Sequence, residues 1–280
     1  MKKRRISVMG IILVLLGIAT LVMALSRANI IGTLVDEARS DVAVAEYDTL
    51  NEAYDGKLVA VAGALTADAN LVDDIIGISR RTVMLERVVE TYQWTQNCES
   101  ECVYQMAWRE GLVNSATFDA NHQNPASQKY ASKSFTAKDQ KFGAYIIPEA
   151  LIQKLDYDTI LGPDELTSLY TGSLKVSGEY LTNSSDPANP AFGDYRISYR
   201  YVKDKDVTVI AQQSANTFTE FRSSSKETIY EIEAGKDTAE AYINRLAENN
   251  RDVNWILVGI GAILVIIGGL IIFNGLKGKK

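Results

Sequence analysis

The side chains best suited to chemistry are two glutamates in one apolar stretch, two cysteines and a single histidine. Glu86 and Glu90 lie in residues 81–94 (RTVMLERVVETYQW), and paired carboxylates can carry out acid–base catalysis. On a strand, four residues separate two carboxylates by roughly 13 Å, which is too far for both to act on one glycosidic bond. The sequence places no nucleophile and base together beside either glutamate. We therefore predict no catalytic residues and a protein that is not an enzyme.

Cys98 and Cys102 flank three residues that the pattern predicts as a hairpin tip. On the oxidising side of a membrane, two cysteines placed in this way most often form a disulfide. The alternatives are free thiols, a redox pair or half of a metal site, but the spacing is C-x3-C rather than C-x-x-C. We therefore predict a structural disulfide between Cys98 and Cys102.

The only histidine, His122, lies in the polar, turn-rich residues 114–134, which are expected to form a long ordered loop. A general base needs a nucleophile or carboxylate nearby, and the sequence indicates none. We expect His122 to make a structural hydrogen bond, and we expect the chain to carry no metal and no cofactor.

Residues 81–94 alternate with a period of two and are rich in Val, Thr, Tyr and Trp, which predicts a strand. Both faces of this strand carry apolar residues, so we expect it to lie centrally in a sheet. Charged side chains in such a strand are costly unless they are paired. Glu86, Arg87 and Glu90 are therefore expected to fix the strand register or to pair with basic residues such as Arg196.

Two uncharged apolar runs predict transmembrane helices at residues 6–25 and 253–276. Basic residues fill the short ends 1–5 and 277–280, and the positive-inside rule then places both termini in the cytosol. Residues 26–252 would form an outward-facing domain. A cleaved signal peptide is the alternative for the first run, but the run is longer than a usual signal core and no A-x-A site follows it.

The charge distribution limits the partners of this domain. All 35 Asp and Glu lie between the spans, whereas seven of the 29 Lys and Arg lie at the two ends. The acidic balance argues against nucleic acid as a partner. Gly10 and Gly17 in the first span, and Gly261 and Gly268 in the second, form stripes of small residues that let helices approach closely.

The fold class predicted for the chain is α+β, with a β-rich outward domain and flanking helices between two membrane spans. Helical spacing continues beyond the first span, either unbroken or restarting after Gly32. A helix is expected at residues 237–249, opened by a capping box at Asp237-x-x-Glu240. A shift of 116 residues aligns Gly56 with Gly172, and five further identities follow, so we predict duplicated units at about 50–165 and 166–236.

Residues 83–94 (VMLERVVETYQW) resemble the L-R-x-V-E-M-Y-Q-W strand of the LUMA family, also called the transmembrane protein 43 family. The resemblance continues with the same order and spacing across the domain. It includes the candidate structural or interaction residues Glu86, Arg87, Glu90, Tyr92, Trp94, His122, Asn124, Asp194 and Arg196. Animal members carry further spans after the large domain, whereas this sequence ends after one, as in shorter prokaryotic relatives.

The resemblance implies an integral membrane protein whose large domain lies on the lumenal or outer side. Animal members occupy the endoplasmic reticulum and inner nuclear membrane, self-associate and help to organise nuclear-envelope proteins. We expect a bacterial inner membrane with a periplasmic or extracellular domain, or the animal locations if the source is eukaryotic. The predicted partners are membrane lipids, further copies of the chain and unidentified membrane or envelope proteins.

The function predicted from these features is that of a non-enzymatic, self-associating protein that scaffolds a membrane protein assembly. A channel or channel subunit is the first alternative, although no charged residue lies within either span. A ligand-sensing domain, or an outward-facing enzyme that uses Glu86, Glu90 or His122, is the second.

Overall fold

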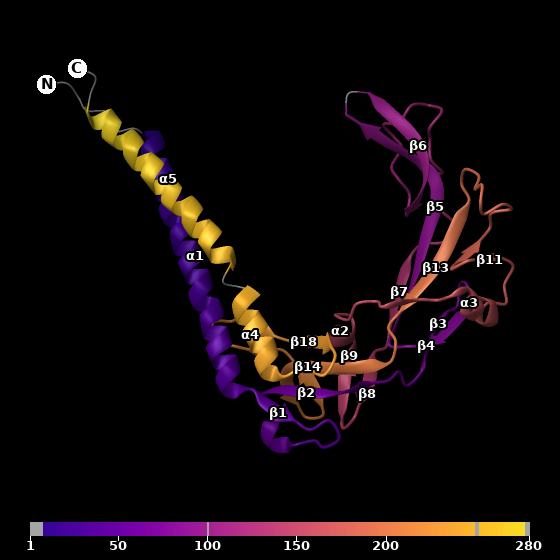
Figure 1. Ribbon diagram of the computed structural model, residues 1–280, viewed down its shortest axis with the longest axis horizontal. Helices are drawn as coiled ribbons and strands as arrows, with labels where there is room; N and C mark the ends of the chain where they lie inside the picture. The colour runs from indigo at the N-terminus through magenta and orange to yellow at the C-terminus, as the bar shows by residue number, and fades with distance from the viewer. Residues whose placement is uncertain (1–7, 100, 250–251, 278–280) are drawn as a thin grey trace.

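Two long helices form a rod that carries a β-rich region at the end opposite the chain termini (Figure 1). The computed structural model describes residues 8–99, 101–249 and 252–277. Helices α1 (Val8–Asp41) and α5 (Asp252–Lys277) run side by side along the rod. Both contain stretches long and apolar enough to cross a membrane. Of the basic ends predicted at residues 1–5 and 277–280, all but Lys277, the last residue of α5, lie outside the described residues.

Glycines bring α1 and α5 into direct backbone contact. A Cβ atom added at Gly17 would lie 2.7 Å from the carbonyl oxygen of Gly261, and one added at Gly268 would lie 2.7 Å from that of Gly10. Side chains larger than hydrogen do not fit at such distances. The two predicted glycine stripes therefore pack against each other within one chain.

Helix α1 is continuous through Gly32 and extends well beyond its apolar run. Its last turns bury Leu34, Val35 and Ala38 against the β-rich region, together with helix α4 (Ala239–Asn249). The capping box predicted at Asp237-x-x-Glu240 is wrong, because the residue that caps the helix is Thr238. The Thr238 hydroxyl caps α4 by accepting a hydrogen bond from the backbone of Ala241, whereas Asp237 forms an ion pair with Arg245.

The first sheet lies next to α1 and α4 and is built from seven strands. Its path is β1 (Ala43–Ala45), β2 (Leu58–Leu65), β14 (Lys205–Ser214), β15 (Thr217–Thr219), β9 (Tyr145–Pro148) and β8 (Asp139–Phe142), with β18 (Glu231–Ala234) on β14. Leu58, Ala60 and Ile210 face the helices, whereas Val59, Val61 and Val209 face a second core that includes α2 (Glu149–Ile152). Alternate side chains of one strand thus bury apolar surface on both faces.

The second sheet contains the strand predicted at residues 81–94. Its path is β11 (Lys175–Ser177), β12 (Tyr180–Thr182), β13 (Tyr195–Tyr201), β5 (Met84–Cys98) and β6 (Cys102–Glu110), with β10 (Thr159–Ile160) on β13 and β7 (Lys133–Thr136) on β5. Strand β5 lies between β13 and β6, so the prediction of a central strand is confirmed. The distal part of the β5–β6 hairpin projects beyond the other strands (Figure 1).

One face of the second sheet is covered by α3 (Pro163–Leu169) and by the hairpin of β3 (Asn70–Asp73) and β4 (Ile78–Arg81). The remaining short elements are the 3-10 helix Glu52–Tyr54 and the hairpin of β16 (Phe221–Arg222) and β17 (Thr228–Ile229). Together these elements give the α+β architecture that the sequence predicted.

The two predicted repeats do not form separate units, because each sheet takes strands from both sides of residue 165. Their first strands also differ. Residues 58–65 form one unbroken strand, whereas the equivalent residues 174–181 fold as a hairpin that turns at Gly178 with φ of 58°. Of the aligned glycine pairs, Gly77 and Gly193 both adopt a positive φ, whereas Gly56 does and Gly172 does not.

Candidate functional site

Strand β5 directs its side chains to two different environments. Its odd-numbered residues from Leu85 to Gln93 are buried beneath α3, the β3–β4 hairpin and the loop after β6. Its even-numbered residues from Glu86 to Trp94 are partly exposed and share a face with neighbouring strands. We call this face the outer face; its members are Glu86, Val88, Glu90, Tyr92, Trp94, Tyr104, Met106, Trp108, Tyr180, Arg196, Ser198 and Arg200.

Two cross-strand ion pairs lie on the outer face. Arg196 is directly opposite Glu90 in the register of β13 and β5, and its Nε lies 2.7 Å from Glu90 Oε2. Arg200 is opposite Glu86 and forms a second ion pair. Both glutamates thus pair with basic residues, and one of these is Arg196, which was named as an example of such a partner. Opposite charges in directly facing positions favour this register over a slipped one.

Aromatic rings hold Arg196 from both sides. Its guanidinium carbon lies 4.6 Å from the ring centroid of Trp108 and 4.2 Å from that of Tyr180. Trp108 in turn contacts Tyr92, with 5.3 Å between the ring centroids. Such stacking restricts an arginine to one orientation while leaving part of the group exposed. Sequence reasoning missed Tyr180 and the stacking role of Trp108, because both depend on which strands become neighbours.

The hairpin end is supported by the loop that contains His122. The His122 ring stacks on Tyr104 at 4.1 Å between centroids and meets Trp94 edge-on at 4.4 Å. Its Nδ1 lies 2.7 Å from Asp119 Oδ2. Hydrogen bonds from the Asn121 backbone and from His122 lower the pKa of Asp119. The structural hydrogen bond expected for His122 is therefore present.

Asn124 extends the pairing of β5 where no strand lies beside it. Its Oδ1 accepts a hydrogen bond from the Trp94 backbone N–H at 2.8 Å, and its Nδ2 donates to the Trp94 carbonyl at 2.9 Å. A side-chain amide can satisfy an edge strand in this way. Two residues before Trp94, the Tyr92 N–H donates a hydrogen bond to the backbone carbonyl of Asp194. The Asp194 side chain accepts a bond from the Ala191 N–H, so Asp194 closes the turn before β13.

Cys98 and Cys102 form a disulfide at the end of the hairpin, as the sequence predicted. They are directly opposite each other in the register of β5 and β6. A two-stranded ribbon is marginal on its own, so the covalent link and the His122 loop together stabilise the projecting part.

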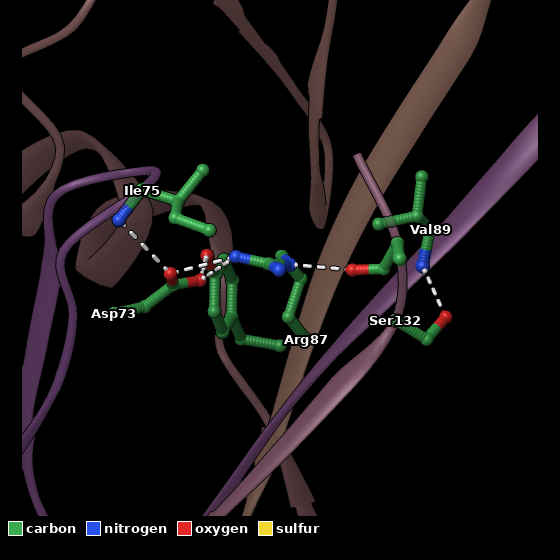
Figure 2. A network of polar contacts seen from close by, with 7 residues as sticks. Asp73, Ile75, Arg87, Val89 and Ser132 are labelled. Atoms are coloured by element: carbon green, nitrogen blue, oxygen red, sulfur yellow. Dashed lines mark hydrogen bonds and ion pairs between the residues drawn. The ribbon is translucent and has the colours of Figure 1, made fainter. Parts of the chain in front are cut away.

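Arg87 points to the opposite face and forms a buried network (Figure 2). Its guanidinium lies 2.6 Å from the carboxylate of Asp73, and its Nε donates to the Ala131 carbonyl at 2.8 Å. The hydroxyl of Tyr199 donates to Asp73 at 2.6 Å. Burial and the Asp73 carboxylate raise the pKa of Tyr199, which keeps this hydroxyl a donor.

The arrangement suits binding and strand organisation rather than proton transfer. Each of the two glutamates forms an ion pair with an arginine directly opposite it, so both act as partners across the sheet. Within the described residues, no group of three or more His, Cys, Asp or Glu could hold a metal ion. The sequence-predicted residues converge on β5 and its neighbours, with Arg87 alone among the charged ones on the buried face.

Comparison with known proteins identifies the family. A family model described as Transmembrane protein 43 matches residues 86–278, from β5 through the second apolar helix. Proteins named Transmembrane protein 43 from Homo sapiens, Mus musculus and Pongo abelii are each 28% identical over 239 residues, or 76% of this chain. The chain spans about 60% of the length of these relatives, and no solved structure matches it. With two candidate spans and a family match over more than half of its length, the chain belongs to the transmembrane protein 43 family.

Proposed function

We propose that this membrane protein is a non-enzymatic scaffold that associates with further copies of itself, and with other membrane proteins, through the outer face of the second sheet. The observation that carries the proposal is the composition and order of that face. Trp, Tyr and Arg are the residues that most often supply binding energy in protein interfaces. Here they are partly exposed, on paired strands.

The outer face is rigid before any partner arrives. Arg196 is held by Glu90 and by two rings, so little side-chain entropy remains to be lost on binding. The paired charges also favour a partner that offers aromatic or polar groups over one that offers a single strong charge. These features support an interface made of rigid anchors rather than a catalytic cleft.

Self-association is assigned to the domain rather than to the membrane helices. The glycine stripes of α1 and α5 already face each other within one chain. A second copy would therefore meet the remaining surface of the rod rather than these paired stripes. A channel would likewise require several copies, because the two helices pack directly on each other.

The orientation that we propose places both termini in the cytosol and the β-rich domain outside it. A cysteine in place of Phe192, which is exposed in the loop before β13, would report the side of the membrane. We expect a membrane-impermeant maleimide to label Phe192→Cys in intact cells and to label Lys2→Cys only after the membrane is opened. The reverse pattern would contradict the orientation.

Site-specific crosslinking in native membranes tests the interface. A photo-reactive amino acid in place of Ser198 sits in the middle of the outer face, whereas one in place of Val103 sits on the opposite side of the β5–β6 hairpin. We expect crosslinks between copies, or to co-purifying membrane proteins, from position 198 and few from position 103. A chain that yields only uncrosslinked monomer from position 198 would refute the proposed interface.

A further inference from the structure

A small cavity lies on the buried face of the second sheet, next to the Arg87 network. Its volume is about 210 Å³. Strands β5 and β13 supply one side, and residues 125–130 of the loop after β6 supply the other. The lining residues are Val89, Thr91, Pro125, Ser127, Gln128, Lys129, Tyr130, Gly193 and Tyr195. This volume is below that of most pockets for drug-sized ligands, so the cavity suits a smaller molecule.

The loop over this cavity is held in place on both sides. Ser132 Oγ accepts a hydrogen bond from the Val89 N–H at 3.0 Å, and Arg87 binds the carbonyl of Ala131 (Figure 2). At the other end, the side chain of Asn124 is fixed to the backbone of Trp94. The cavity between these anchors is therefore a built feature of the fold rather than a gap beneath a free loop.

Two of the residues that line the cavity each carry a buried polar atom without a hydrogen-bond partner. The hydroxyl of Thr91, a residue only 3% exposed, has none, and neither does Oε1 of Gln128. Buried polar atoms in folded proteins are nearly always satisfied, because an unsatisfied one costs about 1–3 kcal/mol. The two residues line the same cavity, so both atoms lie at its wall, next to any occupant.

A positive charge and two aromatic rings complete the lining. Lys129 Nζ lies 5.3 Å from the ring centroid of Tyr130, and the rings of Tyr130 and Tyr195 meet edge-on at 5.5 Å. Hydrogen bonding to the Tyr130 hydroxyl raises the pKa of Lys129, so this ammonium group is charged at neutral pH. No carboxylate is among the lining residues to neutralise it.

We propose that this cavity binds a small carboxylate that also carries a hydroxyl or amino group, such as a hydroxy acid or an amino acid. The carboxylate pairs with the Lys129 ammonium group. The hydroxyl or amino group bonds to the Thr91 hydroxyl and the Gln128 amide, and the two tyrosine rings enclose the carbon chain. The site is separate from the outer face, because Thr91 and Tyr195 point to the other side of the same strands.

Binding is tested on the full chain in lipid nanodiscs with L-serine and L-lactate as probes and glycerol as the neutral comparison. We expect at least one of the two carboxylates to raise the thermal midpoint with dose and to give a saturable calorimetric signal, and glycerol to do neither. Lys129→Met should abolish the preference for the carboxylates over glycerol.

Thr91→Val separates a ligand contact from a structural role. Because the Thr91 hydroxyl has no protein partner, the variant should keep or raise the midpoint of the unliganded protein while weakening probe binding about tenfold, the usual ratio for one hydrogen bond. Ser184→Ala is the matched control. The Ser184 hydroxyl is equally buried and unpartnered but does not line the cavity, so its removal should leave binding unchanged.

Three results would overturn the proposal. Neither carboxylate binds, or glycerol binds as well as they do, or Thr91→Val binds the probes like the wild type. In the first case the cavity holds water only, which could satisfy the two polar atoms equally well. None of these results bears on self-association, because the outer face does not contribute to the cavity.

Discussion

Asp73 and Arg87 form an ion pair inside the second sheet, with 2.6 Å between the guanidinium and the carboxylate and side chains 1% and 3% exposed. The pair links the β3–β4 hairpin to the central strand. Tyr199 completes it from β13, so three separate chain segments meet at one carboxylate. The network therefore joins the second sheet to the β3–β4 hairpin that covers one of its faces.

Removal of one partner from this pair should be strongly destabilising. Asp73→Ala leaves the Arg87 charge buried without a counter-ion, and we expect a loss of about 3–5 kcal/mol in the free energy of unfolding. The double variant Asp73→Ala/Arg87→Met should lose less than the sum of the single variants, because no charge is left unpaired. Denaturation of the full chain in detergent measures both.

A surface pair provides the control for that experiment. Lys236 lies 3.3 Å from Asp206, and both side chains are largely exposed. Lys236→Met should change the free energy of unfolding by less than about 0.5 kcal/mol. An Asp73→Ala variant as stable as Lys236→Met would refute the role assigned to the buried pair.

The Glu90–Arg196 pair should contribute to stability or assembly. Glu90→Gln keeps the shape of the side chain but removes the charge, and we expect a loss of about 1 kcal/mol because the pair is partly buried and stacked. Thermal melting and the oligomeric state of the full chain measure the effect. If both are unchanged, Glu90 does not fix the register or organise the outer face.

Acid should loosen the loop that carries His122. The pKa of Asp119 is lowered in the fold, chiefly by the Asn121 backbone N–H and then by His122. A carboxyl whose pKa falls on folding adds stability above its unfolded pKa, and that contribution is lost as the pH drops through the folded value. We therefore expect the loop to be intact at neutral pH and to loosen below about pH 4.

Tryptophan fluorescence can follow this transition, because His122 lies edge-on against Trp94. A Trp108→Phe/Trp255→Phe background leaves Trp94 as the only reporter. Asp119→Asn should lack the acid transition, since its side chain does not titrate. An identical transition in the Asn variant would assign it to another group.

The glycine contact between the membrane helices should tolerate no side chain. At Gly17, a Cβ atom would meet the Gly261 carbonyl oxygen and Val265, so Gly17→Val should separate α1 from α5 and cost about 1–3 kcal/mol. Gly259→Val is the matched control on α5, since no atom lies within 4 Å of its added Cβ. Disulfide trapping between cysteines placed across the two helices measures the separation. Equal trapping in both variants would contradict the packing.

Local pattern was sufficient to predict the membrane helices, the central strand, its hairpin and the Cys98–Cys102 disulfide. The period-two alternation of β5 and the uncharged runs are properties of short stretches, and side-chain spacing reports them directly. Pairing of the glutamates with basic residues such as Arg196 was also expected, because charges in a half-buried strand are costly unless they are paired. Apolar residues on both faces of β5 indicated that neither face is fully exposed to water. The outer face is in fact only partly exposed.

Contacts between distant segments could not be predicted in the same way. Any of the chain's 35 acidic residues was a candidate partner for Arg87, and only the fold of the β3–β4 hairpin selects Asp73. The glycine stripes predicted close helix packing but not that both stripes belong to one contact. The duplication was inferred from six aligned identities, and two of these are glycine pairs. Glycines recur wherever turns require positive φ, as at Gly77 and Gly193.

The central claim is that the outer face joins copies of this protein in the membrane, and subunit counting in native nanodiscs tests it most directly. Val88 lies on the outer face between Glu86 and Glu90, so Val88→Lys places a long charged side chain there while the pairing with Ser198 is kept. Val103→Lys makes the same change on the opposite side of the hairpin. We predict two or more photobleaching steps per particle for the wild type and for Val103→Lys, and one for Val88→Lys. A single step for the wild type, or equal counts for all three proteins, would contradict the account.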